Sequence, residues 1–524
     1  MSAVGARRVH IACRALATGA AVLASVLFAQ SRPVAADITS SHPAAILVFP
    51  KLLVDTSNGL NTLVRITNVS QSPINVKCFY VNTTPTCSVP TGSCFPNQLS
   101  CTGIVGGIEQ PGTCLPQWQE TDFLFRLTLD QPTGWLVSGG EGVDCRLIDG
   151  VCSNDGTTVC DTDTPCGTGN RCVRPACLPL DGPPLGRSGP NMQLNQGKVP
   201  IAPQDPFVGE LKCIALDDSE APAARNDLIG SALIGRLQAG PDERIEVAGY
   251  NAVGIPAIPN TGNRDNTLVL GGPTDVAEYE GCPNVLILDH YFDGAVDPVL
   301  DNSCQADNTC TIDGVACTSN ADCLHNRCVN DLCTVTGTAC MADPDCDNVC
   351  NGKLCSLSGG SCVSSDDCPS ADFQVRVATA LTLVPCTEDF EEQNSDILAT
   401  TTQFLVYNEF EERFSTSIPV DCFKEIQLSD IVGKPNEFSI FSAGVAGTLT
   451  GQSRIRGVVS KVNTGLTGNT LIGVAEEFRC AGPSYDFPLC NFVDAQRMVS
   501  GNAKNLHFQG RRAVSDFIYL PARN

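Results

Sequence analysis

The sequence predicts a mainly β protein with two homologous β-sandwich domains and disulfide-rich, little-structured insertions. Three observations predict this class. The 524 residues include 47 glycines and 34 prolines, which favour turns and short strands over long helices. There are 30 cysteines, and similar segments recur in the same order in the two halves. We expect an immunoglobulin-like form for each sandwich, with a jelly roll as the alternative, because the sequence does not give the strand order.

Short runs rich in β-branched and aromatic residues, bounded by turn residues, predict the strands. They lie at 45–54, 60–69, 74–82, 122–129, 403–407 and 425–428. The segment 227–237 is the one place where the apolar spacing predicts a short helix. Trp135 lies in an apolar run, so we expect it in the core.

Five segments of the first half have counterparts in the same order in the second half. The pairs are 62–68 with 402–408, 78–79 with 422–423, 135–140 with 438–444, 226–233 with 469–476, and 249–254 with 504–510. Chance matches would not usually keep this order, so we interpret the two halves as a duplication.

These observations define the predicted domains. Residues 1–36 are a signal peptide, 43–262 the first sandwich, 263–300 bridging strands, 301–370 a cysteine-rich array, and 371–524 the second sandwich. Two cysteine-rich insertions, at 83–118 and 141–205, interrupt the first sandwich, as surface loops tolerate added length at small cost.

The N-terminus predicts export. Arg7, Arg8 and Arg14 accompany an uncharged, mostly apolar run at 15–29, and Val34-Ala35-Ala36 before Asp37 fits a signal-peptidase site. That run is shorter than the roughly 20 residues of a membrane span. We therefore expect an exported protein without a transmembrane span, located outside the cell, on its surface or in the periplasm.

The charge restricts the partners. There are 33 basic and 57 acidic residues, and four of the basic ones lie within the predicted signal peptide. Such an acidic chain repels phosphates, so we expect no nucleic-acid partner. A protein or glycan partner remains open.

The cysteines predict disulfides rather than zinc, because the chain has only five histidines and no Cys-x-x-Cys pair. Predicted pairs are Cys480 with Cys490, Cys386 with Cys422, and Cys78 with Cys213. Cys13 falls in the signal peptide, which leaves an odd number of cysteines and makes an intermolecular disulfide a possibility.

The array contains a repeated cysteine pattern. One unit holds Cys310, Cys317, Cys323 and Cys328; the next holds Cys333, Cys340, Cys346 and Cys350; the third opens with Cys355, Cys362 and Cys368. We expect Cys304 to supply the fourth cysteine of the third unit. Units of this size cannot bury a core without cross-links. The pattern resembles the cysteine-rich repeats of Dickkopf-type domains, and similar arrays occur in uncharacterised exported bacterial β-sandwich proteins. That resemblance implies a disulfide-knotted module and no activity.

Two groups of polar residues are candidates for metal binding. Asp343, Asp345 and Asp347 alternate as calcium ligands do, but Cys346 interrupts them and no glutamate closes the loop, so solvated turn residues are the preferred interpretation. Asp289, His290 and Asp293 suit a metal or acid–base site, although a hydrogen-bonded strand histidine is preferred.

We therefore predict a non-enzymatic structural or interaction protein that needs no cofactor. One alternative is a calcium- or glycan-binding protein that uses acidic loops. The other is a hydrolase with a carboxylate pair, for which Glu409 or Asp289 would have to share a pocket with a second carboxyl.

Overall fold

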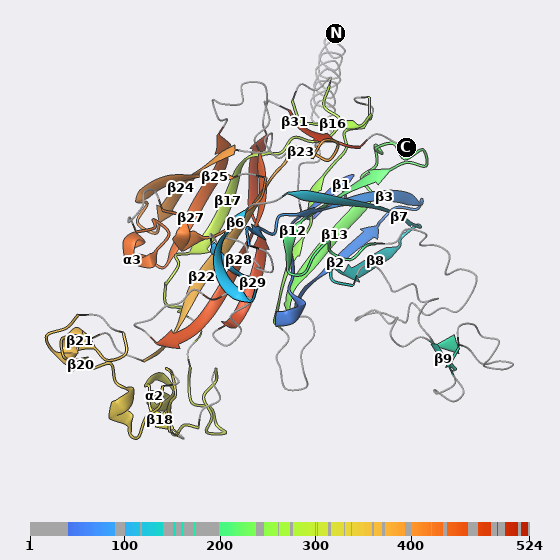
Figure 1. The fold of residues 1–524 in the computed structure, drawn as a ribbon. Coiled ribbons are helices and arrows are strands. Elements are labelled where there is room, and N and C mark those ends of the chain that lie inside the picture. Colours follow the sequence, from blue (N-terminus) through green and yellow to red (C-terminus); the bar gives the residue numbers. More distant parts are fainter. Residues whose placement is uncertain are drawn as a thin grey trace, which may run out of the picture. The chain divides into compact units, whose positions relative to one another are not determined.

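The computed structural model describes most of the chain beyond the N-terminus (Figure 1). The described residues are 40–89, 100–115, 118–139, 150–152, 159–160, 172–173, 199–236, 246–259, 261, 263–272, 276–298, 300, 302–312, 316–329, 331–336, 338–358, 361–368, 372–393, 400–420, 422–432, 438–458, 470–483, 490, 498–511 and 515–521. The predicted signal peptide and most of the 141–205 insertion lie outside them.

The first sandwich has nine strands within the described residues. They are β1 (Ile46–Val54), β2 (Leu60–Asn68), β3 (Ile74–Asn82), β7 (Gln119–Leu127), β8 (Pro132–Leu136), β12 (Phe207–Leu216), β13 (Leu228–Arg236), β14 (Glu246–Asn251) and β15 (Val253–Ile255). One antiparallel sheet has the order β15-β1-β12-β3-β7, and the other has the order β14-β13-β2-β8.

The second sandwich likewise has nine described strands. They are β17 (Pro283–Tyr291), β22 (Phe373–Pro385), β24 (Thr400–Asn408), β25 (Arg413–Val420), β26 (Lys424–Gln427), β27 (Thr450–Val458), β28 (Leu471–Pro483), β29 (Met498–Asn505) and β30 (His507–Arg511). The sheet orders are β25-β24-β27-β17-β30 and β26-β22-β28-β29, and Figure 1 shows β24, β25, β27 and β17 side by side.

The two sandwiches have the same strand order. When each set of nine is numbered along the chain, both five-stranded sheets are ordered 9-1-6-3-4 and both four-stranded sheets 8-7-2-5. The first strand of the second sandwich is β17, so this sandwich begins at Pro283, within the stretch predicted as bridging strands, and not at 371. The cysteine-rich array is therefore an insertion between the first and second strands of the second sandwich.

This strand order tests the segment pairs from the sequence. The segments 226–233 and 469–476 lie at β13 and β28, the seventh strand of each sandwich. The segments 62–68 and 402–408 lie on β2 and β24, which are second and third strands and are not equivalent. The likeness of that pair reflects a shared strand pattern of alternating apolar residues.

The predicted strands of both sandwiches are present, but the helix predicted at 227–237 is wrong, because this segment forms β13. Its buried residues Leu228, Ala232 and Ile234 follow the period of two that a strand requires. Trp135 is buried, as predicted, and its indole nitrogen donates to the Tyr80 hydroxyl.

Smaller elements connect the sandwiches or lie in the insertions. A three-stranded sheet joins β16 (Thr267–Leu270), β31 (Asp516–Tyr519) and β23 (Glu388–Asp389), and another joins β4 (Thr86–Cys87), β6 (Ile108–Leu115) and β5 (Ser100–Val105). A third joins β10 (Val159–Cys160), β9 (Gly150–Cys152) and β11 (Cys172–Val173). Short helices are η1 (Thr56–Asn58), η8 (Leu428–Asp430) and α3 (Ala443–Ala446).

The array itself consists of short turns and ribbons. Its elements are α2 (Asn320–Leu324), the pair β18 (Cys328–Val329) and β19 (Leu332–Cys333), η5 (Asp343–Cys346), the pair β20 (Cys350–Asn351) and β21 (Leu354–Cys355), and η6 (Ser365–Asp367). This agrees with the expected shortage of regular structure.

The two sandwiches share a buried boundary. All ten residues of β12 are buried. This strand reaches the second sandwich through Lys212, whose ammonium donates to the backbone oxygen of Pro385 at the end of β22 at 3.3 Å. The ring of Phe79 on β3 stacks on that of Phe390, just after β23, with centroids 4.1 Å apart. In the described part of the chain no helix is long and apolar enough to span a membrane.

Candidate functional site

A polar groove lies at one end of the five-stranded sheet of the second sandwich. It has a volume of about 600 Å³ and is lined by residues of β17, β24, β27, β28 and β29 with the turn that follows β24. Asp289, Glu409 and Glu477 contribute carboxylates, Lys504 contributes an ammonium, and Tyr407 contributes a ring. The structure thus brings Asp289 and Glu409, both named from the sequence, to one groove.

The Glu409 carboxylate accepts two hydrogen bonds from Thr450. Glu409 lies in the turn after β24, where its Oε1 accepts from the backbone nitrogen of Thr450 at 2.9 Å and from the hydroxyl of Thr450 at 2.7 Å. These bonds lower the pKa of Glu409, because both favour the ionised carboxylate. Glu409 is therefore suited to accept hydrogen bonds or balance positive charge, and poorly suited to donate a proton.

The basic member of the groove bridges two of its strands. The Lys504 ammonium donates to the backbone oxygen of Asp289 at 2.7 Å and to Oε2 of Glu477 at 3.2 Å. The Asp289 carboxylate accepts from the side-chain amide of Gln452 at 3.0 Å. The groove therefore presents carboxylate acceptors and one ammonium donor, which can form hydrogen bonds with a polar ligand.

His290 also lines the groove, but its ring is held in the core by structural contacts. Strand alternation turns its ring away from the exposed side chain of Asp289, and only 3% of the residue is exposed. Nε2 lies 2.8 Å from the Ser453 hydroxyl and Nδ1 lies 3.0 Å from the backbone oxygen of Tyr291. Burial lowers the pKa of His290 to about 4, so the ring is neutral at pH 7.

Asp293 is also a structural residue. Its Oδ1 accepts from the backbone nitrogen of Thr379 on β22, and its Oδ2 accepts from the backbone nitrogen of Ser429 in η8, each at 2.8 Å. Burial raises its pKa to about 7 despite these bonds. The contacts of His290 match the preferred interpretation, a hydrogen-bonded strand histidine, and the Asp293 carboxylate is engaged by the backbone of β22 and η8.

The array contains three units of interlaced disulfides. In each, the first cysteine bonds the third and the second bonds the fourth: Cys304–Cys317 with Cys310–Cys323, Cys328–Cys340 with Cys333–Cys346, and Cys350–Cys362 with Cys355–Cys368. The predicted units are thus displaced by one cysteine. Cys304 opens the first unit instead of completing the third.

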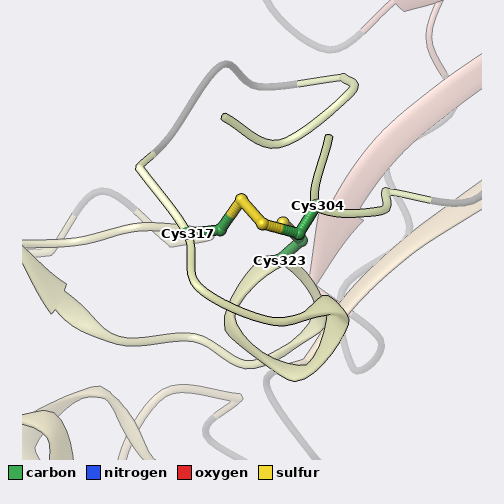
Figure 2. A group of neighbouring side chains, drawn as sticks. All are labelled: Cys304, Cys317 and Cys323. Carbon is green, nitrogen blue, oxygen red and sulfur yellow. A yellow bond between two sulfur atoms is a disulfide. The ribbon is translucent and has the colours of Figure 1, made fainter. Parts of the chain in front are cut away.

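These sulfurs lie close enough to resemble metal ligands. Within the described residues, sets of three potential ligand atoms within 4.8 Å of one another occur only among cysteines, including Cys304, Cys317 and Cys323. Figure 2 shows that set: the disulfide of Cys304 and Cys317 lies beside the sulfur of Cys323, which is bonded to Cys310. Metal ligation requires thiolates, so these disulfides exclude a thiolate metal site while they persist.

A buried asparagine accompanies each unit, and sequence reasoning missed it. Asn302, Asn326 and Asn348 each stand two residues before the first cysteine, so the repeated Asn-x-Cys was the available signal. Asn326 donates to the backbone oxygen of Cys346 at 2.8 Å and accepts from the backbone nitrogen of Val335 at 2.8 Å. Asn302 makes the equivalent bonds to Cys323 and Ile312.

The calcium candidates are explained in part by turn formation. Oδ2 of Asp345 accepts from the backbone nitrogens of Met341 at 2.8 Å and Ala342 at 3.1 Å. Asp322 occupies the same position in the preceding unit, where hydrogen bonds from Thr318 lower its pKa to about 2. Asp347 caps the C-terminus of η5, where its backbone nitrogen donates to the backbone oxygen of Pro344. The side chain of Asp343 lies outside the described part of the chain.

Two of the predicted disulfides outside the array are confirmed. Cys78 bonds Cys213, joining β3 to β12, and Cys480 bonds Cys490. The pair Cys386–Cys422 is wrong, because Cys386 bonds Cys282. That disulfide joins the start of β17 to the end of β22, the two strands between which the array is inserted.

Comparison of the chain with protein-family models gives no match, and comparison with curated protein sequences gives none either.

Proposed function

We propose that this protein is exported and acts without catalysis, as a structural or interaction protein outside the cell, on its surface or in the periplasm. The observation that carries the proposal is the array of three interlaced disulfide units inserted between β17 and β22. Disulfides of this density form and persist in oxidising compartments. The Cys282–Cys386 bond fixes the two strands that carry the array.

Expression of the full chain and of a version lacking residues 1–36 tests export. We expect the full chain to leave the cytoplasm, to begin at Asp37 after cleavage, and to give the array disulfides in non-reducing mass spectrometry. Retention of the full chain in the cytoplasm with titratable thiols contradicts the proposal. Loss of the fold to a chelator but not to a reductant would contradict it as well.

A second candidate function is ligand binding at the polar groove. Asp289, Glu409 and Glu477 beside Tyr407 favour it, because carboxylate acceptors and an aromatic ring suit a sugar or a cation. Calorimetry with calcium and with neutral oligosaccharides tests this candidate, with Glu409→Gln as the variant. No heat with either ligand removes it.

The hydrolase alternative has weaker support, because the pKa of Glu409 is lowered and general acid catalysis needs a carboxyl of raised pKa. Chromogenic glycosides test it. If the native protein cleaves such a substrate and both Asp289→Asn and Glu409→Gln lose this activity, the hydrolase alternative replaces the non-enzymatic proposal.

We also propose that the two sandwiches arose by duplication. The identical strand order of their sheets supports this origin, since nine strands can be arranged in many ways. Sequences of relatives in which the two sandwiches align strand by strand would test it, and relatives with only unrelated halves would oppose it.

A further inference from the structure

A second groove, of about 400 Å³, lies on the outer face of the same five-stranded sheet of the second sandwich. Three arginines line it: Arg413 on β25, and Arg454 and Arg456 on β27. Gln403 and Leu405 of β24 and Val285 of β17 complete most of its floor. We call these six residues the arginine groove.

The strand register brings these side chains to one face. Leu405 is opposite Arg454, and Gln403 is opposite Arg456. The intervening residues Phe404 and Ile455 are buried in the core on the other face. Because residues alternate between the faces of a sheet, the side chains of the arginine groove share the outer face, and their backbone positions are set by strands and not by loops.

The arginines have no carboxylate partner among the described residues. The Nε of Arg456 donates to Oε1 of Gln403 at 2.8 Å, and the guanidinium of Arg454 lies 5.9 Å from the centroid of the Tyr407 ring. None of the ion pairs in the described part of the chain includes Arg413, Arg454 or Arg456. In a chain of net charge −24, three neighbouring guanidinium groups without acids are an unusual concentration of positive charge.

We propose that the arginine groove binds a carboxylated sugar, a uronic acid unit within an oligosaccharide. A guanidinium group holds a carboxylate through two parallel hydrogen bonds, and Arg413, Arg454 and Arg456 offer three such groups. The Gln403 amide and the nearby Ser415 hydroxyl supply hydrogen bonds for sugar hydroxyls. Leu405 and Val285 supply an apolar floor for the C–H face of a sugar ring.

The size and the charge of the protein favour this ligand over other anions. A volume of about 400 Å³ falls in the range of small-ligand sites. Duplex nucleic acid carries one charge per roughly 1.7 Å and is repelled by the net charge of −24. An oligosaccharide with one carboxylate on each sugar unit has a lower density of negative charge, which three arginines can balance. The site is distinct from the polar groove and does not depend on the role proposed for the array.

Calorimetry with the full mature protein tests the proposal. The probes are trimers of galacturonic, glucuronic, mannuronic and guluronic acid, with neutral galactose and mannose trimers for comparison. We expect at least one acidic trimer to bind and the neutral trimers not to bind. Added sodium chloride should weaken the binding, since salt screens exposed charges.

Two variants and a matched control locate the site. Arg454→Gln and Arg456→Gln should each weaken binding about tenfold to a hundredfold, which corresponds to losing a charged hydrogen bond. Arg126→Gln makes the same change of charge on β7 of the first sandwich and should bind as the unchanged protein does. Melting temperatures of all three variants verify that the fold is kept.

Three results would overturn the proposal. One is the absence of binding by any of the four acidic trimers. Another is an equal loss of affinity in Arg126→Gln, which would show that only the overall charge matters. The third is equal or tighter binding of a hexaglutamate peptide with the same dependence on Arg454 and Arg456, which would assign the arginine groove to an acidic peptide.

Discussion

The ammonium group of Lys51 donates a hydrogen bond to the carboxylate of Glu476 across the boundary between the two sandwiches, with both side chains buried. Glu425 also accepts from Lys51, at 2.8 Å. In the same boundary Lys212 donates to Glu210 at 3.0 Å and to Glu388 at 2.6 Å. Each buried lysine thus serves two glutamates, so each cluster has one more acid than base.

This charge count explains the titration of the clusters. Burial raises the pKa of Glu476 and of Glu388, and the attraction of the neighbouring lysine offsets only part of that effect. Burial alone would lower the pKa of Lys51, but Glu425 and Glu476 together outweigh it and raise the pKa. The raised pKa values of Lys51 and Lys212 keep both lysines charged.

Lys51→Met should destabilise the protein by about 3–5 kcal/mol, because it leaves Glu425 and Glu476 in the boundary without their cation. Urea unfolding measures the loss. Lys77→Met is the matched control: Lys77 pairs with Asp122 on the surface, where an ion pair contributes about 1 kcal/mol or less. Equal losses in the two variants would contradict the structural role of Lys51.

Asp293→Asn should change how stability depends on pH. The pKa of Asp293 is about 7 in the folded protein, against 3.8 as the ordinary value, so the folded state binds more protons between these pH values. The contribution of Asp293 to the free energy of unfolding is then fully present below pH 4, and it is lost as the pH rises to 7. The difference amounts to about 4 kcal/mol at most.

The measurement is urea unfolding at pH 5 and pH 8. We expect the native protein to lose more stability than Asp293→Asn over this interval, so that the free energy of unfolding of the native protein minus that of the variant is smaller at pH 8 than at pH 5. Asp289→Asn, an exposed neighbour on β17, should keep the native pH dependence. If the free energy of unfolding changes by the same amount in the native protein and in Asp293→Asn between pH 5 and pH 8, the assignment is contradicted.

The sequence was sufficient for the β class and for most strands, because apolar residues alternate along them and turn residues bound them. It failed at β13, where Leu228 and Ala232 also fit a helical spacing and only packing decides. Gly230 shows how close this packing is, because a Cβ at that position would lie 2.7 Å from the ring of Phe49. Packing of this kind between distant strands is not visible in a local pattern.

The site was less predictable than the fold. Asp289 and Glu409 were named individually, but their common groove depends on the register of β17, β27 and β24, which sequence spacing does not give. The same holds for the arginine groove, since Arg413 and Arg454 are brought together only by pairing through β24. The disulfide units were displaced because the cysteine spacing repeats from either starting point, while Asn326 marks the true start.

Replacing Cys333 and Cys346 by serine should unfold only the middle unit of the array. This bond closes a loop with a sequence separation of 13 residues and contributes about 3 kcal/mol to the unit. Proteolysis followed by mass spectrometry should show new cleavage between residues 326 and 348, with the sandwiches intact. The matched change of Cys78 and Cys213 should instead destabilise the whole first sandwich, because that bond joins β3 to β12 in its core. Cleavage spread evenly over the array in the first variant would show that the three units are not independent.

Asp345→Ala should weaken the turn at η5 with or without calcium. The carboxylate of Asp345 accepts from the backbone nitrogens of Met341 and Ala342, and loss of such a cap costs about 1 kcal/mol. Hydrogen exchange should therefore be faster at these two amides. Asp347→Ala removes the same charge two residues later and should leave both amides protected. A capping role involves Asp345 alone and needs no ion. If calcium protects the native turn from exchange and both Asp345→Ala and Asp347→Ala abolish that protection, the two aspartates act as metal ligands instead.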